Sequence, residues 1–474
     1  MIQSASATVP VAAQPSSLAR NWPFLALLAF SALLHFAWYQ RPLTVVLDEV
    51  YFPRFALDYL KHEYFFDLHP PLGKLIYFAT AWLAGLDPGF SFASNQLAFP
   101  DSSYLVLRVP PRLAGTLLPL VLAGVALELG LSRTAALVIG ALATLDNALL
   151  VIARFALIDT FVLLFGFGAL WCYLHGRERG WWWLIATALL AGAALSVKWT
   201  GLAFTGLVLI AEGVRWLRAP KIDGFIRMAA IVLLVGAVYV ASFAAHFALA
   251  SHTGRDDGVM SQEFQSTLAG NPNAADRSIR RPGFLARFAE LHYRMFDGTR
   301  KSIAPHPYAS RWFEWPFMTR SLDLWAEHAD GRIAHIYFLG NPVVWWASTY
   351  CVLFLLINFP PRLANAMFSN PTPGQPRRPL ERTEVAVVVA YLANMLPFMP
   401  IARVLFAYHY LPALCVALIG LGYLLDRSGV YRRRLAIGLV GLAAVGFVYI
   451  APLTYGLPLD PDAFDARFLV PGWR

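Results

Sequence analysis

Long apolar runs recur along this chain, and many could cross the hydrocarbon core of a bilayer as helices. Only 14% of the residues are charged, far below the roughly one quarter that is typical of globular proteins. The sequence therefore predicts an all-α polytopic membrane protein with about eleven transmembrane helices. The candidate spans are 22–39, 113–130, 134–152, 155–174, 181–197, 200–217, 225–249, 343–358, 384–401, 404–425 and 433–452.

A shorter apolar run over residues 72–86 would reach only about 23 Å as a helix. Whether this run crosses the membrane can be decided from the basic residues of the short loops. Cytoplasmic loops carry an excess of Lys and Arg. If 22–39 enters from the cytoplasm and 72–86 does not cross, every basic cluster faces inward. These are Arg133; Arg177 and Arg179; Arg215, Arg218 and Lys221; Arg362, Arg377, Arg378 and Arg382; and Arg427, Arg432, Arg433 and Arg434. We therefore expect 72–86 to be an interfacial helix.

This topology divides the chain into four parts. Residues 1–21, rich in Ala, Ser and Pro, form a cytoplasmic disordered tail, because they lack the form of a signal peptide. Residues 22–249 form a membrane module that includes a large outer loop, 40–112. Residues 250–342 form a second outer loop, and residues 343–474 form a C-terminal region of four membrane helices. Two large outer loops with short inner connections indicate chemistry on the extracytoplasmic face.

Two adjacent carboxylates, Asp48 and Glu49, follow the first predicted span by about nine residues. A carboxylate at a low-dielectric boundary has a raised proton affinity, which suits a general base acting on a hydroxyl. An isolated Asp-Glu pair is more often a solvated loop entry, so the rest of the loop decides between these interpretations.

The same loop contains Asp67, His69 and Lys74 around a Pro-Pro pair. Paired prolines stiffen the backbone, so His69 should be held at a fixed angle at the head of the interfacial helix. Lys74, one turn into that helix, could reach a phosphate at headgroup level. Such a helix head can also be a simple interfacial anchor.

Other charged or polar residues fall within or beside apolar runs, where they need partners or a function. The predicted topology places them at the same depth in the membrane as Asp48. Cations grouped around carboxylates at this depth are suited to binding a lipid-linked phosphate substrate. Pairing within the membrane, for instance Arg154 with Asp159, is the structural alternative. The residues are Arg112, Asp146, Arg154, Asp159, Lys198, Arg403, Tyr408 and His409.

Aromatic and basic residues alternate in the second outer loop, over 306–316. This composition suits contacts with a sugar or an extended peptide, but it is equally typical of a helix lying in the aromatic belt of the membrane. The candidate contacts are His306, Tyr308, Arg311 and Trp312. The sequence carries neither a Walker loop, a dinucleotide fingerprint nor a zinc-protease helix.

Several motifs, in order, resemble the protein O-mannosyltransferases, a family of GT-C glycosyltransferases that use a polyprenyl-phosphate mannose donor. They are DEVYFPRFALDYLKHEYFFDLHPPLGK, RLAGTLLPL, LDNALLVIARFALIDTFVLLF, SVKWTGL, HPYASRWFEWPFMTR, LGNPVVWW and RVLFAYHYLPAL. The long first loop and HPYASRW favour this family over the related aminoarabinose transferases. Eukaryotic members carry a β-trefoil module in the second large outer loop. The roughly ninety residues here hold no such insertion, so the chain resembles the bacterial type.

The resemblance implies that Asp48 is the catalytic base, with Glu49 beside it. It also implies that Asp67, His69 and Arg112 shape the donor and acceptor pocket. Lys198 and Arg403 are expected to hold the donor phosphate because of their depth and charge. The expected partners are polyprenyl-phosphate mannose, an exported polypeptide with Ser or Thr together with the export machinery, and the lipid bilayer.

The expected activity is therefore inverting transfer of mannose to Ser or Thr hydroxyls, by a multi-pass enzyme of the plasma membrane. Its N-terminus would be cytoplasmic and its active site extracytoplasmic. No cofactor is required by the sequence, and a divalent metal is left open. The alternatives are sugar transfer to a lipid or glycan acceptor, and a transporter of a lipid-linked sugar. The transporter is disfavoured because the two halves show no internal repeat.

Overall fold

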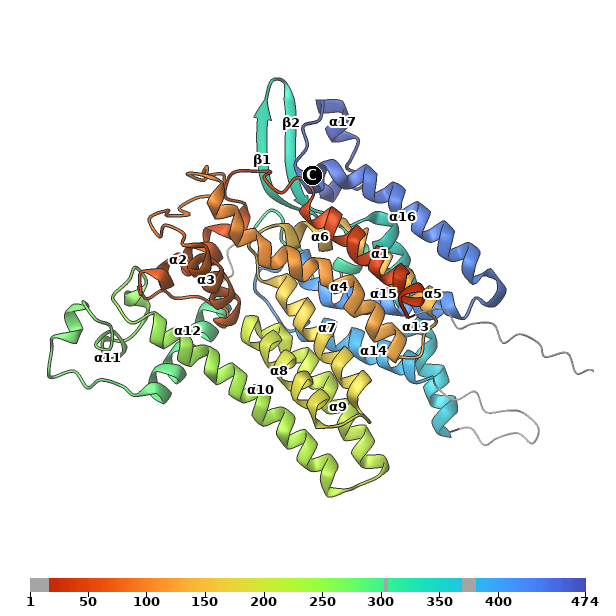
Figure 1. Cartoon of the computed structure of the whole chain (residues 1–474), viewed down its shortest axis with the longest axis horizontal. Helices are drawn as coiled ribbons and strands as arrows, with labels where there is room; N and C mark the ends of the chain where they lie inside the picture. Colours follow the sequence, from red (N-terminus) through yellow and green to blue (C-terminus); the bar gives the residue numbers. More distant parts are fainter. Residues whose placement is uncertain (1–16, 302–305, 369–380) are drawn as a thin grey trace, which may run out of the picture.

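The computed structural model describes residues 17–301, 306–368 and 381–474, and these form a bundle of long helices with smaller elements at one end (Figure 1). The long helices are α1 (Ser17–Phe36), α4 (Val109–Glu128), α5 (Arg133–Thr144), α6 (Asn147–Arg154), α7 (Asp159–Gly176), α8 (Trp181–Val197), α9 (Leu202–Arg218), α10 (Ile222–Leu249), α13 (Pro342–Phe368), α14 (Arg382–Met395), α15 (Leu411–Asp426) and α16 (Arg432–Tyr455). The smaller elements include α2 (Phe52–Leu60), α3 (Leu72–Ala84), α11 (Gln262–Gln265), α12 (Phe284–Lys301), α17 (Pro461–Asp465) and the strands β1 (Leu322–Ala329) and β2 (Arg332–Phe338).

Every apolar run that was predicted to span contains at least one of these helices. By length and composition, six helical segments of the described chain could cross a membrane, or seven if the bent pair α5 and α6 counts as one span. The chain is therefore a multi-span membrane protein, while the count of eleven stays a prediction. Helix α15 is buried along almost its whole length and forms the centre of the bundle, whereas α10 and α16 lie at its edges (Figure 1).

The predicted span 134–152 is not one straight helix, because α5 and α6 meet at an angle of 56°. Asp146 sits at the break, where its carboxylate caps α6 by accepting a hydrogen bond from the backbone N–H of Leu149 at 2.9 Å. It also accepts one from the N–H of Asn341 at 3.1 Å, at the start of α13. An N-cap residue has a non-helical backbone conformation, as Asp146 has here, so it interrupts the helix that precedes it. Asp146 is thus a buried structural residue that joins two parts of the bundle.

Helix α3 coincides with the predicted interfacial helix over 72–86, and its thirteen residues span only about 20 Å. It ends at Gly85, whose positive φ of 63° is the usual left-handed C-terminal cap. Of the predicted N-terminal tail, residues 1–16 lie outside the described residues. Residues 17–21 already belong to α1, so this helix begins earlier than the apolar run from Trp22 suggested.

The prediction of an all-α chain misses one hairpin. Strands β1 and β2 pair antiparallel and project from the bundle beside α17 (Figure 1). The turn between them is Asp330-Gly331, and both residues have positive φ, at 50° and 73°. An Asp-Gly pair between two alternating segments is a strong hairpin signal, so this element was detectable from the sequence.

Candidate active site

Asp48 lies in a short 3-10 helix, Leu47–Val50, in the loop between α1 and α2. Its carboxylate forms no hydrogen bond or ion pair with any residue in the described parts of the chain. Burial, together with the negative charges of Asp159 and Asp67, raises its pKa to about 6, and the positive charge of Lys198 opposes this rise. The carboxylate oxygens of Asp48 thus bond to none of the described residues, and the carboxylate has an elevated proton affinity. A general base acting on a hydroxyl requires both properties.

Glu49 has the opposite environment, although it is the next residue. Arg108 donates two hydrogen bonds to its carboxylate, at 2.6 and 2.8 Å, and both side chains are 1% exposed. The backbone N–H groups of Val46 and Ala156 donate two more, each at 2.9 Å. Arg108 also donates to the carbonyls of Pro42 and Thr44. Since its acceptor sites are occupied, Glu49 anchors the loop.

Asp67, His69 and Lys74 come together at the turn before α3. Lys74 is buried, forms an ion pair with Asp67, and donates to the carbonyl of His69 at 2.6 Å. With these bonds, Lys74 fixes the turn and does not extend toward headgroups as the sequence suggested. Burial lowers the pKa of His69 to about 4, so its imidazole is neutral near pH 7 and can both donate and accept hydrogen bonds.

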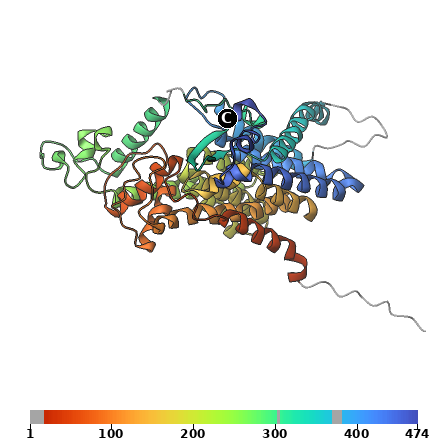
Figure 2. The same cartoon turned by 90° about the horizontal axis from the view of Figure 1, so that it is seen from above.

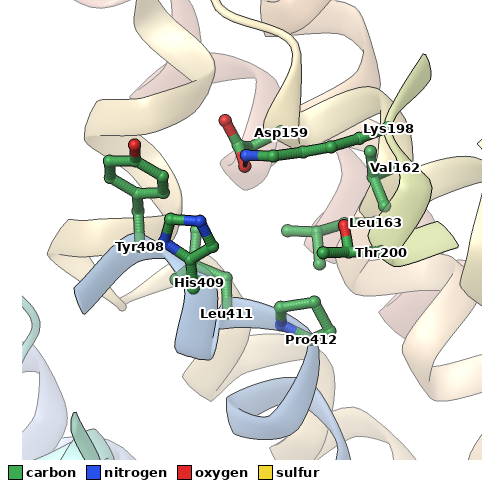
Figure 3. A pocket seen from close by; sticks show the side chains of 9 residues that line it. All are labelled: Asp159, Val162, Leu163, Lys198, Thr200, Tyr408, His409, Leu411 and Pro412. Atoms are coloured by element: carbon green, nitrogen blue, oxygen red, sulfur yellow. Dashed lines mark hydrogen bonds and ion pairs between the residues drawn. The ribbon is translucent and has the colours of Figure 1, made fainter. Parts of the chain in front are cut away.

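Lys198 and Asp159 line a polar pocket with Tyr408 and His409 (Figure 3). Lys198 ends α8, Asp159 begins α7, and their charged groups are 2.8 Å apart. The Lys198 ammonium also lies 5.0 Å from the ring centre of Tyr408. In His409, Nδ1 is bound to the carbonyl of Phe406, while the buried Nε2 has no partner among the described residues. The pocket thus offers an ammonium and an imidazole nitrogen to a ligand.

Arg403 lies in the loop just before Tyr408 and forms no ion pair with the described residues; its buried Nε also lacks a hydrogen-bond partner there. The second outer loop packs on this segment. The ring of His306 lies 4.9 Å from that of Phe406, and the N–H of Ser310 donates to the carbonyl of Leu405 at 2.9 Å. Of the predicted contacts in that loop, Trp312 is partly buried, whereas Arg311 is exposed.

Arg112 and Arg154 form a separate network. Arg112 donates to the carbonyl oxygens of His35 at 2.7 Å and of Arg154 at 3.2 Å, and Arg154 donates to that of Ala37 at 2.8 Å. Both guanidinium groups stack on tyrosines, Tyr39 and Tyr455. The suggested pairing of Arg154 with Asp159 is wrong, because Asp159 pairs with Lys198. The two arginines tie the end of α1 to α4 and α6, below the loop that carries Asp48.

An apolar cavity of about 450 Å³ lies beyond the polar pocket, lined by α4, α7, α9, α14 and α15. Three segments line both the polar pocket and the apolar cavity, through residues that lie one or two helical turns apart. The pairs are Leu163 and Phe167 on α7, Thr200 and Leu207 on η3 (Trp199–Gly201) and α9, and Pro412 and Val416 on α15. Arg218 and Arg382 lie at its far end. A polar pocket and an apolar cavity on neighbouring turns of the same helices suit an amphiphile with a polar head.

Sequence reasoning missed Arg108, although it is the partner of Glu49. Arg108 lies in the first outer loop, 40–112, outside every predicted span, and the interpretation of that loop rested on its carboxylates. An arginine in the turn before an apolar run was the available signal. The described residues bring no three His, Cys, Asp or Glu side chains together as metal ligands, so they provide no candidate site for the divalent metal that the sequence left open.

Two family models match this chain. The one described as dolichyl-phosphate-mannose-protein mannosyltransferase matches residues 25–251, and the one described as the C-terminal four TMM region of protein-O-mannosyltransferase matches residues 284–473. Among curated proteins, dolichyl-phosphate-mannose--protein mannosyltransferase 6 of Candida albicans is 29% identical over 264 residues, covering 48% of this chain and 32% of that protein. Protein O-mannosyl-transferase 2 of Danio rerio is 30% identical over 249 residues, covering 49% and 33%. The chain spans about a third of the length of these relatives.

Solved structures show the same fold. The protein O-mannosyltransferase Pmt1–Pmt2 complex of Saccharomyces cerevisiae bound to the sugar donor matches with a TM-score of 0.88 at 18% identity, over 97% of this chain and 93% of that chain. ArnT from Cupriavidus metallidurans bound to undecaprenyl phosphate matches with a TM-score of 0.53 at 14% identity, over 92% and 77%. At these identities the likeness shows the fold alone, and that fold is the GT-C fold.

Proposed function

Because the chain belongs to the protein O-mannosyltransferase family, we propose that it transfers mannose from a polyprenyl-phosphate donor to Ser or Thr hydroxyls of exported proteins. One observation carries this proposal: Asp48 has no bonding partner among the described residues, and its pKa responds to the charges of Lys198 and Asp159, which line a pocket one or two helical turns from an apolar cavity. A base for the acceptor, a cation for phosphate and a space for the lipid tail are the three features that the reaction needs.

The donor binds with its polyprenyl tail in the apolar cavity and its phosphate in the polar pocket. Lys198 and the free Arg403 neutralise the phosphate, and Nε2 of His409 bonds a phosphate or sugar oxygen. The negative charge that develops on the departing phosphate is the largest charge change of the reaction, so fixed cations there contribute strongly to the rate.

The acceptor hydroxyl attacks the anomeric carbon from the face opposite the phosphate. As the new C–O bond forms, Asp48 takes the hydroxyl proton, and the electron pair of the breaking C–O bond leaves with the polyprenyl phosphate. One displacement inverts the anomeric configuration. Glu49 and Arg108 act on this step only through the loop, because their charges satisfy each other.

We further propose that the enzyme lies in the plasma membrane with a cytoplasmic N-terminus and an extracytoplasmic site, and that it is of the bacterial type. The orientation that puts the basic loops inside supports the first point. The described part of the second outer loop, whose regular elements are short 3-10 turns, α11, α12 and the hairpin, supports the second.

The decisive test is transfer by the purified chain in lipid discs. Mannose-labelled polyprenyl phosphate and a Ser/Thr-rich peptide are supplied, and the products are identified by mass spectrometry. Mannosylated peptide is the expected product. Label that instead accumulates in lipid or glycan, with none in peptide, would replace this proposal with the aminoarabinose-transferase-like alternative.

A further inference from the structure

Helix α12 carries an apolar face that nothing in the described structure covers. Leu285, Tyr293 and Phe296 are 77%, 64% and 56% exposed, and with Ala289 they lie at helical spacing on one side. Four exposed positions of this kind along a helix of eighteen residues exceed the single exposed apolar side chains that are normal on a protein surface. This face needs an apolar partner.

A neighbouring side of α12 packs against the end of α10. The ring of His292 lies 4.6 Å from that of Phe243, and its Nε2 is 2.7 Å from the hydroxyl of Tyr239. Further along, Phe284 contacts Phe247 at 5.8 Å between ring centres. Helix α12 is thus fixed to the last three turns of α10, and it lies beside the bundle (Figures 1 and 2).

These contacts fix the depth of α12 in the membrane. Helix α10 has 28 residues, and about twenty of them suffice to cross the hydrocarbon core. Counted from Phe225, where the predicted span begins, the core ends near residue 244, beside Phe243 and just over one turn beyond Tyr239. A helix that packs on these two residues lies at the boundary between acyl chains and headgroups, and α10 itself exposes Val240 beside it.

The charges of α12 complete the pattern of an interfacial helix. Its polar side carries Arg294 and Lys301, and residues 276–301 as a whole contain seven Lys or Arg but only three acidic residues. Basic residues beside an apolar face are attracted to anionic headgroups. An acidic protein partner would satisfy the charges but would leave the apolar face at membrane depth unexplained.

We propose that α12 docks onto the anionic lipid surface on the Asp48 side of the bilayer, with Leu285, Ala289, Tyr293 and Phe296 among the acyl chains. A consequence for the site follows from its inner face. Leu291 and Met295 line a small pocket together with Asp67, His69 and Lys74. Lipid contact therefore holds the cover of this pocket in place; this last step rests on the proposed function, whereas the docking does not.

The docking is tested in the full chain, in discs that hold one copy each. The background carries Cys172→Ala, Cys351→Ala and Cys415→Ala, and a fluorophore is attached at Phe296→Cys or at the control Lys301→Cys, whose side chain is 75% exposed on the polar side. We expect nitroxide-labelled lipids to quench the probe at 296 severalfold more than at 301, and aqueous iodide to show the reverse order. Equal iodide quenching at both positions would overturn the proposal and leave the face free for a protein partner.

The charge dependence and the effect on the site have separate readouts. Discs of phosphatidylcholine alone should raise iodide quenching at 296 relative to discs with phosphatidylglycerol; identical quenching would overturn the anionic part. Phe296→Glu should raise the KM for the donor in discs, while Val430→Glu, at a position 89% exposed between α15 and α16, leaves it unchanged. If the wild-type chain transfers no mannose at all, the proposed function fails, whereas the quenching result stands unaffected.

Discussion

Asp48 and Glu49 are consecutive in the chain, yet the carboxylate of Asp48 bonds to none of the described residues, whereas that of Glu49 is held by Arg108 at 2.6 Å with both partners 1% exposed. The short 3-10 helix turns them in different directions, so that Glu49 anchors the loop to the start of α4 and Asp48 is left near Lys198. Anchoring one member of the pair is what holds the other in position. Substitutions of Asp48 and of Glu49 should therefore have different effects on activity and stability.

Asp48→Asn should lower kcat by about 10²–10⁴-fold, the range typical of a lost general base. The amide keeps the size of the side chain, and no hydrogen bond to the described residues is lost. The melting temperature and donor binding should therefore stay near those of the wild type. Turnover close to wild type, measured with saturating donor, would exclude Asp48 as the base.

Glu49→Gln should act through stability. Removing one partner of a buried ion pair typically costs about 3–5 kcal/mol, because the remaining charge is buried without compensation. We expect a lower melting temperature and a loss of activity that follows it. Glu49→Gln with Arg108→Met removes both charges and should recover part of the stability; a double variant no better than the single one would contradict the pairing.

The acid limb of the pH profile should report Asp48. Its folded-state pKa is raised to about 6, so the carboxyl is protonated below that pH and cannot accept the hydroxyl proton. The value of kcat/KM should therefore fall as the pH drops through about 6. Lys198 lowers the pKa of Asp48 and Asp159 raises it, so Lys198→Met should move the limb to higher pH and Asp159→Asn to lower pH. A limb that stays fixed in both variants would assign it to another group.

Substitutions of Arg403 and Arg154 are predicted to have different effects on donor binding and stability, although both residues are arginines near the site. Arg403 has no ion pair with the described residues, so Arg403→Gln should reduce kcat/KM for the donor by about 10²–10³-fold with little change in melting temperature. Arg154 is bonded to the carbonyl of Ala37 and stacked on Tyr455, so Arg154→Gln should destabilise the fold. Paired melting and donor-titration curves distinguish the two effects.

The apolar cavity should select the donor by its tail. Ala211→Trp places a large ring in the cavity and should raise the KM for a long polyprenyl-phosphate mannose more than for a short-chain analogue. Leu442→Trp on α16, at a position 60% exposed, is the matched control and should affect neither donor. An equal effect of Ala211→Trp on both donors would argue against the cavity as the tail site.

Much of the architecture follows from local pattern. Apolar length predicted where the helices lie, and the short run at 72–86 predicted α3, because helix length and burial are properties of a contiguous segment. The hairpin was equally local, since Asp330-Gly331 specifies its turn, and it was overlooked. The break at Asp146 was not visible in the apolar pattern, because it depends on the capping carboxylate and on Asn341 nearly two hundred residues away.

The sequence by itself determined that this chain is a helical membrane protein, that its family is that of the protein O-mannosyltransferases, and which polar residues require explanation. Tertiary structure alone decided how those residues divide. It paired Lys198 with Asp159 and withdrew Glu49, Lys74, Arg112 and Arg154 into structural bonds. It left Asp48, Arg403 and Nε2 of His409 without bonding partners among the described residues. The reason is physical: a buried charge takes whichever partner the packing of distant helices brings within about 3 Å, and no local pattern encodes that choice.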